Sequence, residues 1–147
     1  MSGPTRWGFS IFCEDIRVEV GEKSSWMGIF RKEILIPDQF PVFVNSIAVI
    51  IKYYENKGSC DGDLEFRVYG TDDVIVGQQR IGRREIAATV LAPVASGQDE
   101  NLVAFEIPFI FAPMVFEREG FLKVRMYDGV EEVKLGSIRV RAVAQPG

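Results

Sequence analysis

The chain has 147 residues, of which 47% are hydrophobic and 26% are charged, so its length and composition fit one domain, covering residues 1–147, with a core of its own. A formal net charge of −4 gives no electrostatic reason to bind nucleic acid or an anionic membrane, since such binding depends on clustered Lys and Arg. The sequence shows no basic and then apolar leader and no apolar run of about 20 residues, which predicts a cytoplasmic protein. We expect residues 1–6 to be a flexible N-terminal segment.

The first predicted element is a hairpin within residues 12–30. Apolar and charged side chains alternate over residues 16–20, and residues 21–24 have the length of a hairpin loop. The apolar positions upstream of residue 14 have the opposite parity, so Glu14-Asp15 is predicted to be a bulge or bend. Gly28 indicates a second bulge or a close approach of the backbone.

The middle of the chain predicts several strands and one ambiguous segment. Residues 47–51 are apolar and mostly β-branched, as expected for a central strand covered on both faces. Residues 64–69 and 122–127 alternate strictly, so each predicts a strand with one dry face. Residues 83–92 suit a helix by their alanines and a strand by their alternation, and strand is the preferred interpretation. The polar residues 95–101 predict an exposed loop.

Residues 102–107 predict a further strand, with Pro108 and Pro113 marking its end and an edge. Asp128-Gly129 is a turn signal that joins the last two strands into a hairpin. These short, alternating elements together predict an all-β fold, an antiparallel β-sandwich of about seven to nine strands that is immunoglobulin-like or C2-like.

The residue inventory excludes much enzymology. The sequence contains no histidine, which excludes a Ser-His-Asp triad, a Cys-His dyad and any histidine metal ligand, and it has no glycine-rich phosphate-binding motif. Cys13 and Cys60 have no C-x-x-C spacing, so we expect two free thiols. Trp7 and Trp26 are interpreted as packing aromatics. We therefore predict a protein that is not an enzyme and has no cofactor.

Acidic turns form the only group of residues with a chemical interpretation. Asp61 and Asp63 lie just before one predicted strand, Asp72 and Asp73 lie just after it, and Asp128 lies in the final hairpin. Loops at one end of a sandwich could supply the 6–8 oxygen ligands that calcium takes. Asp is also a standard turn residue, and turn chemistry is the favoured explanation.

The pattern F-C-x-D-I-R-x-E-x-G-x-K-x-S-x-x-G-I-F over residues 12–30 resembles the N-terminal signature of a family of small bacterial proteins classed as a domain of unknown function. Residues 113–129, with a proline, a Gly-aromatic strand and an Asp-Gly turn, resemble the ending of such sandwich domains. The resemblance implies a single all-β domain. It supplies no activity, cofactor or catalytic residue.

Two functional hypotheses follow. The preferred one is a non-catalytic protein-interaction or structural module that binds a protein partner or a second copy of itself. The alternative is a calcium-dependent domain for sugar or lipid headgroups that uses the acidic turns. Residues 107–116 are uncharged and rich in large side chains, so they are the candidate interface if they lie on an edge. If the segment instead crosses between sheets, all four large side chains are buried. These four are Phe109, Phe111, Met114 and Phe116.

Overall fold

The computed structural model describes residues 6–37, 39–56, 63–82 and 102–143, and all regular structure in these parts of the chain is β-strand. The strands, in chain order, are β1 (Arg6–Cys13), β2 (Asp15–Glu19), β3 (Lys23–Met27), β4 (Glu33–Ile36), β5 (Val42–Val44), β6 (Ile47–Asn56), β7 (Leu64–Tyr69), β8 (Ile75–Ile81), β9 (Leu102–Phe111), β10 (Met114–Phe116), β11 (Gly120–Asp128) and β12 (Glu131–Ala142).

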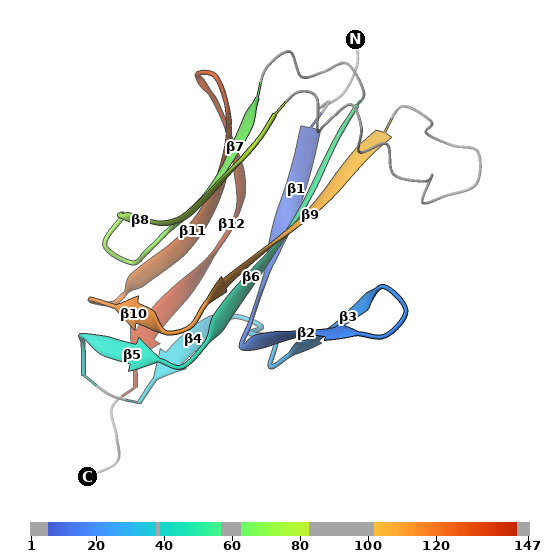
Figure 1. Cartoon of the computed structure of the whole chain (residues 1–147). Helices are drawn as coiled ribbons and strands as arrows, with labels where there is room; N and C mark the ends of the chain where they lie inside the picture. The colour runs from blue at the N-terminus through green and yellow to red at the C-terminus, as the bar shows by residue number, and fades with distance from the viewer. Residues whose placement is uncertain (1–5, 38, 57–62, 83–101, 144–147) are drawn as a thin grey trace.

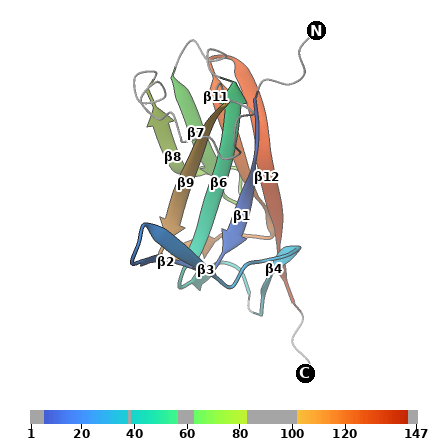
Figure 2. The same ribbon diagram turned by 90° about the vertical axis from the view of Figure 1, so that its right-hand side faces the viewer.

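Two main sheets face each other (Figure 1). The three-stranded sheet has the order β1-β6-β9, and the five-stranded sheet has the order β4-β12-β11-β7-β8. Neighbouring strands are antiparallel, except that β4 runs parallel to β12. Two short ribbons, β2–β3 and β5–β10, lie at the end of the molecule opposite to the start of β1, and we call this end the base (Figures 1 and 2). This arrangement confirms the all-β prediction and fits a sandwich.

The main core fills the space between the two sheets. The alternation in β7 and β11 places every second side chain there, so the predicted dry faces are confirmed. The fully buried members from these two strands are Leu64, Phe66, Val68, Leu122, Val124 and Met126. Gly129 and Val130 turn the chain from β11 into β12, with Gly129 at a φ of 61°, and this confirms the predicted final hairpin.

Strand β6 is the centre of the three-stranded sheet and is buried on both faces. Residues 47–51 are all at most 1% exposed, as the run of apolar residues predicted. Ile47, Val49 and Ile51 face the main core, whereas Ala48 and Ile50 belong to a second, smaller apolar cluster on the other side of the sheet. The three-stranded sheet therefore has apolar side chains on both faces.

Two predicted boundaries are corrected. Arg6 is the first residue of β1 rather than part of a flexible segment, because its guanidinium is held 2.9 Å from the Asp128 carboxylate. Strand β9 runs through Pro108 to Phe111 instead of ending at Pro108, since an edge strand tolerates a residue without an N–H. The predicted strand at 83–92 and loop at 95–101 lie outside the described residues.

Gly77 of β8 provides a test of the packing between the five-stranded sheet and strand β9 of the three-stranded sheet. A Cβ atom at this position would lie 2.9 Å from Phe111 and 3.0 Å from Phe109, whose rings stack on each other. We expect Gly77→Val to lower the free energy of unfolding by about 1–3 kcal/mol through overpacking. Urea denaturation measures this, with Gln79→Ala on the same strand as the control. Equal stability of Gly77→Val and wild type would contradict the packing described.

Candidate functional site

The outer face of the five-stranded sheet is polar and internally paired. The Arg67 guanidinium binds the Glu65 carboxylate, donates a hydrogen bond of 3.2 Å to the Tyr69 hydroxyl and lies 4.5 Å from the centre of the Tyr127 ring. The two tyrosine hydroxyls are 2.8 Å apart, and Gln78 Nε2 donates to Glu65 at 2.7 Å. Such a network of hydrogen bonds and ion pairs between side chains is typical of a sheet face that is exposed to water.

The outer face of the three-stranded sheet has the opposite character. In the four rows where β1, β6 and β9 are all paired, alternation and strand register place twelve side chains on it, and only two of them are charged. They are Trp7, Phe9, Ile11 and Cys13 from β1; Ala48, Ile50, Lys52 and Tyr54 from β6; and Ala104, Glu106, Pro108 and Ile110 from β9. A sheet face this apolar requires a cover.

The β2–β3 hairpin covers the part of this face nearest the base (Figure 2). Ile16 and Trp26, which are opposite each other in the hairpin, pack on the buried Cys13, Ala48 and Ile50. The predicted bend before the hairpin is confirmed at Glu14, whose backbone N–H donates to the Met27 carbonyl at 2.9 Å. Gly28 makes the predicted close approach. Its φ is 67°, and a Cβ atom at this position would lie only 2.8 Å from the Glu14 side chain.

The rest of the face and the end of the hairpin remain exposed, and we call this surface the open face. Its exposed apolar side chains are Trp7 (48% exposed), Phe9 (46%) and Ile110 (57%) on the sheet, and Val18 (89%) and Val20 (92%) on the hairpin. The Trp7 ring stacks on the Tyr54 ring at 4.2 Å between centroids. Near its centre, Lys52 Nζ lies 3.5 Å from Glu106 Oε1 and 5.4 Å from the centre of the Trp26 ring.

The edges of the three-stranded sheet are less open than its face. Pro108 interrupts the N–H groups of edge strand β9. At the other edge, β1 lies against β12, where a Cβ on Gly8 would be 2.9 Å from the Leu135 side chain and one on Gly136 would be 3.7 Å from Ser10. The β1 edge is therefore covered by β12, whereas the β9 edge is interrupted by a proline.

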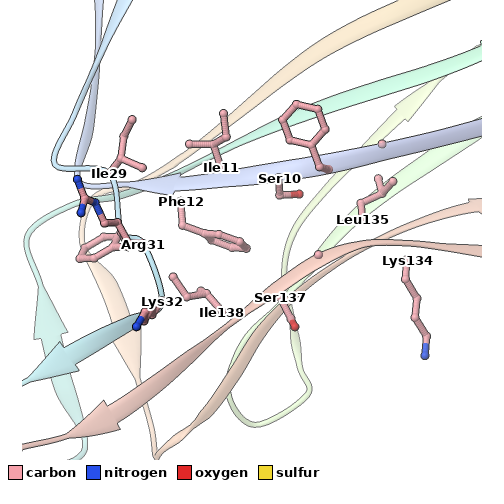
Figure 3. A pocket seen from close by; sticks show the side chains of 14 residues that line it. Ser10, Ile11, Phe12, Ile29, Arg31, Lys32, Lys134, Leu135, Ser137 and Ile138 are labelled. Atoms are coloured by element: carbon pink, nitrogen blue, oxygen red, sulfur yellow. The ribbon is translucent and has the colours of Figure 1, made fainter.

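A small groove of ≈ 310 Å³ opens between β1 and β12 (Figure 3). Phe12, Leu135 and Ile138 line it, and Ser10 Oγ is buried there without a hydrogen-bond partner among the described residues. The charged ends of Arg31, Lys32 and Lys134 point away from the space between Phe12 and Ile138 in Figure 3. The groove lacks the converging polar groups that orient a ligand.

A larger groove of ≈ 830 Å³ lies at the base, between β4, β5 and the bend at Glu14. Phe43 and Ile110 are its most exposed apolar lining residues, and Asp15 Oδ1 already accepts a hydrogen bond from the Ile16 N–H at 2.9 Å. Ile110 belongs to this groove and to the open face, so the two surfaces are continuous.

The acidic residues singled out from the sequence are not brought together in the described structure. Asp63 precedes β7 and pairs with Arg80 at 3.3 Å, whereas Asp72 and Asp73 follow β7, about 20 Å further along the strand. Asp73 is 2.8 Å from Lys123 Nζ, which lowers the pKa of the Asp73 carboxyl. Asp61 lies outside the described residues. Within the parts of the chain that are described, no three Cys, Asp or Glu residues form a group that could hold a metal ion.

The four interface candidates lie on the inner side of the sandwich. Met114 and Phe116 of β10 are buried in the main core. Phe109 and Phe111 are half-buried, pack against that core and stack on each other with centroids 6.2 Å apart. Residues 107–111 belong to edge strand β9 and the chain then crosses to β10, so the segment combines both alternatives. Only Met114 and Phe116 of the four candidates are buried, and the exposed apolar side chain of the segment that lies on the open face is Ile110.

The sequence did not predict that an aromatic side chain of the open face would be exposed. The sequence predicts that both tryptophans pack, but Trp7 is exposed on the open face, whereas Trp26 does pack as predicted. The signal that could have found the open face is the parity of β1. Residues 7, 9, 11 and 13 are all Trp, Phe, Ile or Cys, opposite to the side that carries Phe12 into the core.

No protein-family model matches this sequence, and no curated protein matches it.

Cys13 reports whether the hairpin is closed. Its side chain is fully buried beneath Ile16 and Trp26, and burial raises the pKa of its thiol. In a Cys60→Ser background, we expect Trp26→Ala to speed labelling of Cys13 by a thiol reagent at least about tenfold, because opening of the hairpin costs less without the indole. Trp7→Ala, on the same face but away from Cys13, is the matched control. Similar rates in both variants would show that Trp26 is not the cover.

Glu55, at the end of β6 away from the base, is a buried carboxyl. Burial raises its pKa, and the Tyr53 hydroxyl and the Arg6 charge offset this effect only in part. The folded protein thus holds this proton to a higher pH than the unfolded chain does, so its contribution to stability falls as pH rises above about 4.5. We expect the melting temperature of Glu55→Gln, relative to wild type, to increase from about pH 4 to about pH 8. Glu117→Gln provides the baseline, and a pH-independent difference would contradict the assignment.

Proposed function

We propose that this protein is a non-catalytic interaction module that binds a protein partner through the open face. The observation that carries the proposal is the contrast between the two outer faces of one sandwich. One carries a paired polar network around Arg67, with Phe121 exposed elsewhere on it, and the other exposes Trp7, Phe9 and Ile110 beside the valines of the hairpin. Contiguous exposed apolar surface of this kind usually marks an interface.

The chemistry of the chain supports contact rather than catalysis. The sequence has no histidine, and the grooves at β1–β12 and at the base are lined mainly by apolar side chains. The separation of Asp63 from Asp72 and Asp73 gives the calcium-dependent alternative no support among the described residues. In the described parts of the chain, no helix is long and apolar enough to cross a membrane.

We also propose the finer assignments that the sequence suggested. These are an immunoglobulin-like or C2-like topology, a cytoplasmic location and membership of the bacterial family that residues 12–30 resemble. The supporting features are the packing of two facing sheets and the free thiol of Cys13.

Phe9 and Phe121 allow a matched test, because both are 46% exposed but lie on opposite outer faces of the sandwich. A photo-crosslinking phenylalanine analogue at position 9 should give discrete protein adducts in cells, since that position faces the partner. The same analogue at position 121 should give none. Adducts from both positions, or from neither, would refute the open face as the contact surface.

A further inference from the structure

The centre of the open face carries charges of both signs. Lys52 on β6 and Glu106 on β9 are directly opposite in the strand register, and their charged atoms are 3.5 Å apart. Their side chains are 26% and 46% exposed, so both remain accessible to a partner. Covering charged groups with a purely apolar surface is costly, and a fitting partner offers an anion over Lys52 and a cation over Glu106.

A second copy of this chain offers those two charges at the same spacing. A two-fold axis that runs along the strands, between β6 and β9, places Lys52 of each copy over Glu106 of the other. A two-fold axis across the strands would instead place like charges together. We infer that the occupant of the open face is a second copy of this chain in the first of these arrangements, an inference that rests on the proposed function.

The size of the surface fits such a dimer. With side-chain areas of about 150–250 Å² for the large residues, the exposed fractions of the five apolar side chains correspond to about 500 Å². A standard interface buries about 800 Å² per partner, of which about 57% is apolar, or about 450 Å². The open face therefore supplies the apolar area that one half of a stable dimer needs.

The hairpin adds a second contact. Val18 lies on the same side of the hairpin as Ile16 and Trp26, but it extends beyond the sheet that those two residues cover. The hairpin projects outward from the base of the three-stranded sheet (Figure 1). The proposed axis places both hairpins at one end of the dimer, where the exposed Val18 and Val20 face the other copy.

Charge reversal tests the arrangement by its symmetry. Lys52→Glu alone and Glu106→Lys alone each place two like-charged pairs in the dimer, so each should weaken self-association, measured by analytical ultracentrifugation, at least about tenfold. An equimolar mixture of the two variants restores both opposite-charge pairs and should associate nearly as tightly as wild type. Lys123→Glu, which breaks an ion pair on the other outer face, should leave association unchanged. The melting temperature of each variant checks that it is folded.

Other outcomes separate this inference from the proposed function. A wild-type monomer that still forms adducts with a different protein from position 9 overturns the second copy and leaves the interaction module standing. A monomer without adducts overturns both. A dimer that neither charge variant weakens, or that the mixture does not restore, overturns the arrangement. A monomer that binds phosphatidylcholine–phosphatidylserine vesicles, and loses this binding on Phe9→Glu, assigns the open face to membrane and overturns the second copy.

Discussion

The structure depends on one constraint. The three-stranded sheet has apolar side chains on both of its faces, but only one of these faces packs against the five-stranded sheet. Strand alternation sends Val49 and Ile51 into the main core and Ala48 and Ile50 to the opposite side. The second face then has to be covered by something other than the five-stranded sheet, and this need explains both the position of the hairpin and the remaining exposed surface.

The hairpin meets this need in part. Its Trp26 closes a small second core over Cys13 and reaches the Lys52 ammonium group, which is also paired with Glu106. Lys52 therefore connects the hairpin to the centre of the open face. A substitution there affects the hairpin and the outer surface together, so the fold of the N-terminal hairpin and the contact surface are physically linked.

The two outer faces also differ in the contacts that hold their side chains. On the five-stranded sheet, Arg67 connects a carboxylate, a hydroxyl and an aromatic ring, so its neighbours satisfy one another and need no partner. On the three-stranded sheet, the stacked Trp7 and Tyr54 present apolar rings in a fixed orientation. Rigid, exposed aromatics lose little entropy on contact, which favours them as anchors of an interface.

The sequence by itself determined the elements whose signal is local. Alternation identified the dry faces of β7 and β11, the apolar run identified β6 as a central strand, and turn residues identified the final hairpin and the bend at Glu14. Only the tertiary structure decided which apolar face is the inner one. Phe109 and Trp7 each lie in a row of large apolar side chains at every second position, yet the pleat of β9 turns Phe109 toward the core and that of β1 turns Trp7 toward solvent. The reason is that alternation fixes which side chains share a face, whereas the packing of one sheet on another, between residues distant in the chain, fixes which face is covered.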